Sequence, residues 1–314
     1  MDWLYVALGL VILLLGGDSL VRGAVNLSLR LGVPALIVSL TIVSFGTSAP
    51  ELLISIGAVT EGVPGLAMGN VIGSNTANVL LVLGVPALLA PMATSCCNTR
   101  KSYLITLGAT FLFIALCFFG PITWWHALIL LGYLAIVLLD NFREAVSHRA
   151  DAKACNEEEV EGADPNMSWP KIGLFILLGL IGLPLGADLL IDGAENIART
   201  FGVPETVIGL TLVAIGTSLP ELATTVMAAL RKQADVALGN VIGSNMFNLL
   251  AIIGVAGLVG PLPVDPELLQ FDLWVMLGAT VLLVPFVFFK RDITRGWGIA
   301  LTAGYVAYIL TVLL

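Results

Sequence analysis

The stretch SFGTSAPELLIS, residues 44–55, places glycine, hydroxyl side chains, a proline and the carboxylate of Glu51 inside an apolar run. Residues 214–225 read AIGTSLPELATT and repeat the same polar order around Glu221. A charged side chain at the centre of a membrane span costs on the order of 3 kcal/mol, so such residues usually serve a function. The repeated carboxylate therefore predicts a functional site inside the apolar part of the chain.

The composition is that of a polytopic membrane protein. Of 314 residues, 58% are hydrophobic and 11% charged, and the mean hydropathy is +1.00. Ten apolar stretches are long enough to cross ~30 Å of hydrocarbon as helices. They cover residues 3–24, 33–59, 66–90, 102–119, 122–139, 172–191, 203–230, 236–260, 272–289 and 296–314. The sequence thus predicts an all-α membrane protein with ten transmembrane helices.

Basic residues predict the orientation. When the segments between spans are assigned alternately to the two sides, 13 of the 14 lysines and arginines fall on one side, and Arg199 falls on the other. Because basic loops stay in the cytoplasm, we expect both termini outside and a solvated cytoplasmic linker at residues 141–171. The N-terminus lacks a basic region typical of a cleaved signal peptide. The expected location is the cell inner (plasma) membrane.

The chain contains an internal repeat. Residues 15–92 align without a gap on residues 185–262, an offset of 170, with 34 identities in 78 positions. Five predicted spans separate matching positions, and five is an odd number, so the second copy is expected upside down. Residues 1–140 and 172–314 are therefore predicted to be two inverted five-helix repeats, an architecture of secondary transporters that bind substrate near the midplane.

The first motif predicts a broken helix that offers oxygen atoms. Pro50 cannot donate to the carbonyl of Gly46, and its ring crowds that turn, so we expect carbonyls near residues 44–47 to be released from helical bonding. Thr47 and Glu51 share a helix face, and Ser48 flanks it. Thr217, Ser218 and Glu221 repeat the pattern.

The second motif, GNVIGSN, adds oxygens at a four-residue spacing. Ser74 and Asn78 repeat as Ser244 and Asn248. Carboxylates, hydroxyls, amides and carbonyls without thiolate or imidazole suit Na⁺ or Ca²⁺ better than Zn²⁺. Two glutamates buried close together are expected to hold a cation or share a proton.

Other polar and small residues receive structural interpretations. Asp18 is expected to pair with Arg22 one helical turn away, and its counterpart Asp188 is also assigned a structural role. The glycines of the second motif are expected to make close helix contacts; they are Gly69, Gly73, Gly239 and Gly243. The four cysteines are expected to form no disulfide, and the acidic stretch at residues 157–164 is expected to be solvated.

At these two motifs the sequence resembles the cation/Ca²⁺ exchanger superfamily, in particular a compact prokaryotic Na⁺/Ca²⁺ exchanger, across essentially the whole chain. The resemblance implies ten helices and a Ca²⁺ position formed by Glu51, Glu221 and the carbonyls of Thr47 and Thr217. It also implies Na⁺ positions at the carbonyls of Ser44 and Ala214, the hydroxyls of Ser48, Ser218, Ser74 and Ser244, and the side chain of Asn78. Well-studied relatives have aspartate where this chain has Asn248.

These observations predict a secondary antiporter that exchanges Ca²⁺ for Na⁺ and alternates access by movement of the first and sixth spans. H⁺/Ca²⁺ exchange through the same glutamates is the alternative, because Asn248 leaves two carboxylates. A passive channel is a further alternative, which inverted repeats do not exclude. An intramembrane hydrolase is disfavoured, since neither His126 nor His148 can be placed beside Ser48. We expect no enzyme activity, no cofactor and no nucleic-acid partner. Ca²⁺ and Na⁺, or H⁺ in the alternative, are expected to bind as substrates. The protein is expected to function as a monomer in the lipid bilayer.

Overall fold

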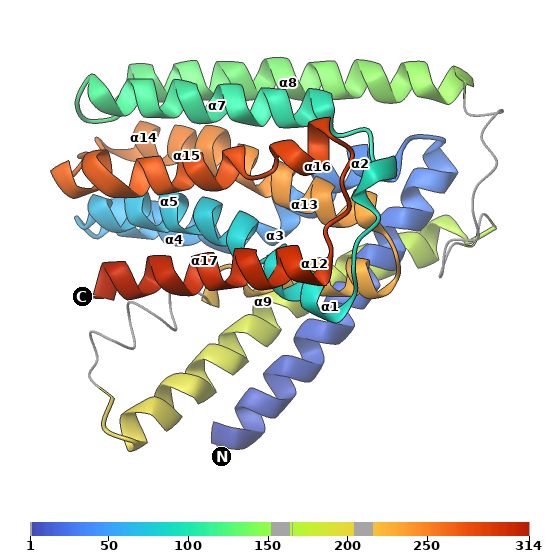
Figure 1. Ribbon diagram of the computed structural model, residues 1–314, viewed down its shortest axis with the longest axis horizontal. Coiled ribbons are helices and arrows are strands. Elements are labelled where there is room, and N and C mark those ends of the chain that lie inside the picture. The colour runs from blue at the N-terminus through green and yellow to red at the C-terminus, as the bar shows by residue number, and fades with distance from the viewer. Residues whose placement is uncertain (1, 152–163, 165, 204–215, 314) are drawn as a thin grey trace.

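The computed structural model describes residues 2–151, 164, 166–203 and 216–313 (Figure 1). It describes the side chains of all these residues except 96, 145–151 and 313. Regular structure in these ranges is helical, apart from two isolated antiparallel bridges, Met92 to Ile293 and Ile122 to Leu262. The all-helical prediction is therefore confirmed for the described part of the chain.

The first half contains eight α-helices: α1 (Asp2–Leu31), α2 (Ala35–Val38), α3 (Ser44–Thr47), α4 (Ala49–Thr60), α5 (Pro64–Leu80), α6 (Gly84–Leu89), α7 (Arg100–Phe118) and α8 (Trp124–Asp151). The second half contains α9 (Trp169–Thr200), α12 (Leu219–Leu230), α13 (Ala234–Phe247), α14 (Ile253–Val259), α15 (Leu273–Val281), α16 (Val284–Phe288) and α17 (Arg295–Leu313). π-helical turns at Ser39–Val43, Asn248–Ile252 and Leu268–Asp272 continue several of these helices.

The predicted spans correspond to long apolar helices. Seven helices in the described ranges are long and apolar enough to cross a membrane, and the bent pair Ala35–Thr47 and Ala49–Thr60 makes an eighth. Helix α17 covers the predicted tenth span. The predicted seventh span lies partly outside the described residues, which contain its second half as α12. The total of ten spans therefore stays a prediction. Helix α8 continues to Asp151, about three turns into the segment predicted as linker.

Helices α1 and α9 pack against each other as an antiparallel pair that crosses the layered body of α4, α5, α13, α14, α15 and α17 at a steep angle (Figure 1). Glycines recur every seven residues on both helices: Gly9, Gly16 and Gly23 on α1, and Gly179, Gly186 and Gly193 on α9. A Cβ atom added at Gly9 would lie 2.6 Å from the backbone nitrogen of Leu190. Because there is no room for side chains here, the two backbones lie in direct contact. We call this interface the glycine seam.

The two isolated bridges join the halves of the chain at opposite ends of the helix bundle. Met92, after α6, pairs with Ile293, before α17, with N···O distances of 3.0 and 3.1 Å. Ile122, before α8, pairs with Leu262, after α14, at 2.9 Å in both directions. Each half thus has its loop bound to the other half, and the helices between them enclose a buried apolar core.

Candidate functional site

The second span bends where the sequence predicts a break. Helices α3 and α4 meet at Ser48 (φ −87°, ψ 5°), and the segments on either side differ in direction by 43°. Ser218, before α12, has nearly the same backbone angles, φ −86° and ψ 3°. Pro50 lies in the first turn of α4, where its missing N–H costs no hydrogen bond. The identical motif therefore produces the same local backbone in both copies.

One detail of the predicted break is wrong. The carbonyl of Ser44 is not released from helical bonding, because it accepts from the backbone N–H of Ser48 at 3.0 Å and from Thr47 Oγ1 at 3.3 Å. The bend falls after this turn. A π-helical turn at Ser39–Val43, which the sequence analysis missed, comes before it.

The structure brings the two predicted carboxylates together. Glu51 is 1% exposed and Glu221 is 0% exposed. Ser48 Oγ donates to Glu221 Oε1 at 3.1 Å, and the carboxylates of Glu51 and Glu221 are close enough to repel each other. Thr47 and Ser244 also face the Glu221 carboxylate. One glutamate from each copy thus occupies a common buried space.

Two threonine–asparagine contacts connect the first motif of each copy to the second motif of the other. Thr47 Oγ1 donates to Asn240 Oδ1 at 3.3 Å, and Thr217 Oγ1 donates to Asn70 Oδ1 at 3.5 Å. Thr47 Oγ1 also lies 3.4 Å from Ser244 Oγ. Each residue of one threonine–asparagine contact is 170 positions from its equivalent in the other, the offset of the sequence repeat.

Asn70 and Asn240 were not among the predicted site residues. Asn240 Nδ2 donates to Thr225 Oγ1 at 3.2 Å, and Asn70 Nδ2 donates to Ser55 Oγ at 3.4 Å. Both amides therefore orient a threonine of the site through one end and anchor on the preceding helix through the other. The sequence could have indicated them, because both copies of the second motif have asparagine at this position.

The two predicted asparagines of the third and eighth spans lie in different surroundings. Asn78 Nδ2 donates to Asn245 Oδ1 at 3.0 Å, and Asn245 Nδ2 donates to the carbonyl of Asn75 at 3.2 Å. Asn248 is 0% exposed and begins the π-helical turn Asn248–Ile252. Neither its Oδ1 nor its Nδ2 has a hydrogen-bond partner among the described residues.

Buried polar atoms without partners gather at the predicted site. Nearly all buried polar atoms in proteins are hydrogen-bonded, yet the described residues contain 11 buried side-chain atoms that lack a partner, and seven of them belong to predicted ligands. They are Glu51 Oε2, Glu221 Oε2, Ser74 Oγ, Ser218 Oγ, Asn78 Oδ1 and both terminal atoms of Asn248. Six of the seven are oxygen atoms, so the arrangement can offer a cation several ligands that the fold leaves unused.

Two predicted Na⁺ ligands differ from this group. Ala214 lies outside the described residues. The hydroxyl of Ser44 contacts three backbone carbonyls, those of Ser39 at 2.7 Å, Asn240 at 3.0 Å and Gly239 at 3.3 Å. The predicted Na⁺ ligand is the carbonyl of Ser44; its hydroxyl, which was not a predicted ligand, joins the second span to α13.

A cavity of about 300 Å³, lined by residues of α4, α5, the π-helical turn Leu268–Asp272 and α17, reaches the site. Its polar lining includes Asn70, Ser74 and Thr217, and Asp272 lies further along it with Tyr308. Tyr308 donates its hydroxyl to Asp272 Oδ1 at 2.8 Å. Two predicted ligands, Ser74 and Thr217, thus border a space large enough for a hydrated cation.

The chemistry of the site is that of hard-cation binding. The ligand set consists of carboxylate, hydroxyl, amide and carbonyl oxygen, and the described residues contain no cluster of three or more His, Cys, Asp or Glu. No Ser–His pair forms at Ser48 in the described structure, because Ser48 donates to Glu221 and His126 Nδ1 contacts Thr123.

A helical membrane protein with a buried oxygen site shared between two similar halves belongs to the class of cation transporters. Comparison with known families identifies the group: the sodium/calcium exchanger protein family matches residues 1–142 and 171–314. The chain belongs to this family of exchangers.

Individual relatives extend over nearly the full chain. The sodium/calcium exchanger MaX1 of Methanosarcina acetivorans is 34% identical over 98% of this chain and 97% of its own length. The putative antiporter CaxA of Alkalimonas amylolytica is 36% identical over 90% and 88%. A solved structure of the sodium-calcium exchanger NCX_Mj, soaked with 10 mM Na⁺ and zero Ca²⁺, superposes with a TM-score of 0.82 at 32% identity and covers 98% of both chains.

Proposed function

We propose that the protein is a secondary antiporter that exchanges Ca²⁺ for Na⁺ at the buried site between Glu51 and Glu221. The observation that carries this proposal is the concentration of unpartnered buried oxygens around two carboxylates that come from different halves of the chain. Two negative charges buried together need a compensating cation or proton, because desolvated like charges are costly.

The proposed architecture consists of two inverted five-helix repeats, residues 1–140 and 172–314, joined by a cytoplasmic linker at 141–171. The paired contacts Thr47–Asn240 and Thr217–Asn70, related by the offset of 170, support it. The reciprocal bridges at opposite ends of the bundle also support it. We place the protein in the cell inner membrane with both termini outside, as a functional monomer.

Exchange follows from competition for the same oxygens. Ca²⁺ bound between the two glutamates uses both negative charges, so Na⁺ ions that bind to the same carboxylates must displace it. The proposed Ca²⁺ ligands are Glu51, Glu221 and the carbonyls of Thr47 and Thr217. The proposed Na⁺ ligands are the same two carboxylates together with the carbonyl of Ala214, the hydroxyls of Ser48, Ser218, Ser74 and Ser244, and the Asn78 side chain, with Asn248 beside them. Because one set excludes the other, the two ions cross in opposite directions.

Alternating access is assigned to movement of α1 and α9 together over the site. Gly46, next to the bend, is covered by the side chain of Leu180 from α9, and Gly216 is covered by Ile191 from the same helix. Apolar side chains of the α1–α9 pair thus lie directly over both broken segments. Displacement of this pair along the bundle would uncover one side of the site and cover the other.

The glutamates provide the direct test. In membrane vesicles, Glu51→Gln and Glu221→Gln are each expected to reduce ⁴⁵Ca²⁺ uptake driven by an outward Na⁺ gradient by about 100-fold or more, because neutralising one of two charges removes several kcal/mol of cation attraction. Glu195→Gln is the matched control, since Glu195 pairs with the exposed side chain of Arg199 one helical turn away, and pairs that solvent reaches contribute little. Normal uptake by both Glu51→Gln and Glu221→Gln would rule out the assigned site.

H⁺/Ca²⁺ exchange is the second candidate, and Asn248 favours it. With asparagine here, Glu51 and Glu221 are the two carboxylates of the site, which two protons or two Na⁺ would neutralise. Uptake of Ca²⁺ driven by a pH gradient in Na⁺-free medium would identify the proton as the driving ion. Current recorded during exchange separates three Na⁺ per Ca²⁺, which moves net charge, from two monovalent ions per Ca²⁺, which does not.

A further inference from the structure

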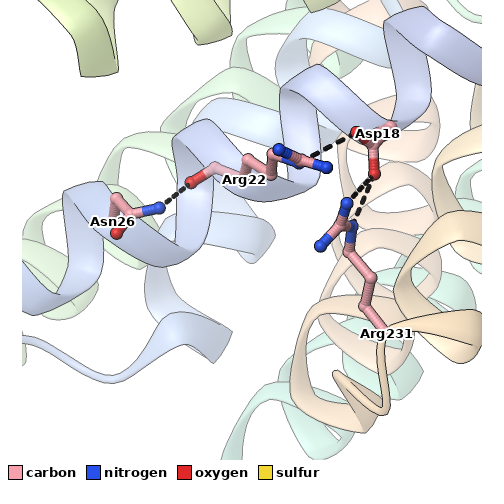
Figure 2. Close-up of polar contacts among 4 residues, drawn as sticks. All are labelled: Asp18, Arg22, Asn26 and Arg231. Carbon is pink, nitrogen blue, oxygen red and sulfur yellow. Dashed lines mark hydrogen bonds and ion pairs between the residues drawn. The ribbon is translucent and has the colours of Figure 1, made fainter. Parts of the chain in front are cut away.

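An ion-pair cluster outside the cation site connects the α1–α9 pair to the body of the protein. Asp18 on α1 lies between two arginines (Figure 2). Arg22, one turn further along α1, places its Nε 2.9 Å from Asp18 Oδ2. Arg231, at the end of α12, donates from Nε to Asp18 Oδ1 at 2.5 Å and also contacts it through Nη2. Sequence analysis predicted the contact with Arg22, and the structure adds Arg231.

The Asp18–Arg231 contact is well placed to control movement between α1 and α12. The side chains are 19% and 14% exposed, so solvent screens this pair less than an exposed one. Close by, a Cβ added at Gly17 would lie 2.9 Å from the carbonyl oxygen of Ala223 on α12. The ion pair therefore crosses an interface between backbones that any shift of α1 must break.

A second contact holds the same end of α1. Asn26 Nδ2 donates to the carbonyl of Arg22 at 2.8 Å, and Asn26 Oδ1 accepts from the backbone N–H of Asp164 at 2.8 Å. Asp164 belongs to the segment before α9. Both attachments lie toward the end of α1 that the charge pattern predicts to be cytoplasmic.

The repeat supplies no equivalent attachment at the opposite end. Positions 170 residues away from Asp18, Arg22 and Arg231 are occupied by Asp188, Asp192 and Glu61. One acid and two bases at one end thus correspond to three acids at the other. Asp188 and Asp192 repel each other, and no ion pair of Asp188 is found among the described residues. Two halves that share 34 of 78 residues have opposite charges at this point.

We propose that Asp18 and Arg231 form a latch that stabilises the conformation with the predicted cytoplasmic end closed, and that the three acids leave the outer end without one. The inference rests on the proposed exchange function and on movement of α1 with α9. An attachment at one end alone makes the two access states unequal in free energy. The protein therefore spends more time open to the outside in the absence of ions.

The expected effect of breaking the latch is a change of opposite sign at the two faces. The apparent dissociation constant of an ion equals its intrinsic value divided by the fraction of protein open to that side. Loss of a partly buried pair of charged hydrogen bonds is expected to shift the population about threefold to tenfold. Half-saturating Ca²⁺ should therefore fall at the cytoplasmic face and rise at the outer face.

Arg231→Gln in inside-out and right-side-out vesicles tests this expectation through ⁴⁵Ca²⁺ uptake at graded Ca²⁺. Arg231→Lys should retain most of the wild-type behaviour, and Asp188→Asn, the unpaired counterpart of Asp18, should leave both faces unchanged. Equal changes of half-saturating Ca²⁺ at both faces, or no change at either face, would contradict the proposed latch. Wild-type vesicles without Na⁺-driven uptake would instead overturn the proposed function.

Two further variants make the test independent of a folding defect. Glu61→Arg offers Asp188 a basic partner and should shift both faces in the same direction as Arg231→Gln; a shift in the other direction would contradict the proposal. Asp18→Cys with Arg231→Cys, in a chain whose four native cysteines are replaced, should be joined by a reducible bifunctional thiol reagent about as long as an arginine side chain, which should stop exchange until the crosslink is reduced. Continued exchange by the crosslinked protein would show that α1 and α12 need not separate.

Discussion

Helices α5 and α13 carry the same seven residues, GNVIGSN, and the contacts described for them differ. A Cβ added at Gly243 of α13 would lie 2.3 Å from Ser44 Oγ and 2.8 Å from the carbonyl of Leu40. The positions that match Ser44 and Leu40 in the second copy, 214 and 210, lie outside the described residues, which supply no such contact for Gly69 and Gly73. The prediction of close glycine contacts is thus confirmed for Gly239 and Gly243, and it stays a prediction for Gly69 and Gly73.

The asparagines four residues after each serine of this motif lie in different surroundings in the two copies. Asn78 is held by Asn245, and the chain leaves the α-helix at Leu81–Leu83. Asn248 has no partner among the described residues and begins a π-helical turn, a feature that often marks functional positions. The side chain before it also differs, since Phe247 stands where the first copy has Ala77. Among the described residues, the second copy therefore keeps an unpartnered amide at this position, and the first uses its amide to join two spans.

The largest effect is expected from giving the second copy a charge. Asn248→Asp would add a third buried carboxylate, and a unit charge near a cation contributes roughly 4 kcal/mol at contact distance with an effective dielectric constant of 20. We expect half-saturating Ca²⁺ to fall at least about tenfold and exchange to become dependent on an additional Na⁺. Titration of ⁴⁵Ca²⁺ uptake and of the exchange current measures both quantities.

Asn78→Asp is the matched change in the first copy. It removes the donor to Asn245 and brings a carboxylate toward an amide oxygen, so we expect lower yield of folded protein without the gain in Ca²⁺ affinity. If Asn78→Asp and Asn248→Asp have the same Ca²⁺ affinity and the same yield of folded protein, the different surroundings of the two asparagines do not affect function.

A smaller effect is expected from adding a methyl group to the glycines. Gly243→Ala must displace Ser44 or Leu40 and should destabilise the protein by about 1–3 kcal/mol. Gly132→Ala, at an exposed position of α8 with no described atom within 4 Å of an added Cβ, is the control and should change stability by less than about 0.5 kcal/mol. Thermal unfolding of the two variants in the same detergent measures the difference, and equal midpoints would contradict the packing described for α13.

The smallest effect is expected from the amide pair. Asn78→Ala and Asn245→Ala should each cost about 1 kcal/mol, and the double variant should cost less than their sum because both remove one hydrogen bond. Asn248→Ala should leave stability nearly unchanged. A double-mutant cycle on unfolding midpoints measures the coupling, and strict additivity would show that the Asn78–Asn245 bond contributes nothing.

The sequence predicted the features that repeat in the chain. Composition indicated a helical membrane protein, the first motif located the bend at Ser48, and its second copy located the matching backbone angles at Ser218. The buried glutamates Glu51 and Glu221 were found through their duplication. These features depend on local chemistry, namely proline, glycine and charge in an apolar context, and a sequence displays local chemistry directly.

The missed features depend on contacts between distant segments. Two of the three contacts of the Ser44 hydroxyl are with carbonyls of α13, nearly 200 positions away, so its role in joining the two spans could not be read from its neighbours in sequence. The π-helical turns of spans two and eight have no signature comparable to proline. Asn70 and Asn240 were visible as identities, but their role in orienting Thr217 and Thr47 emerges only when the two copies face each other.

The glycine seam has a consequence for how the protein is made. Helix α1 is synthesised before its partner α9, which begins only at Trp169, after the rest of the first half. During that interval the bare backbone face of α1 has lipid or an insertion factor as its neighbour. The first half made alone would keep that face uncovered. Biogenesis therefore requires that α1 remain without its partner until α9 has been synthesised.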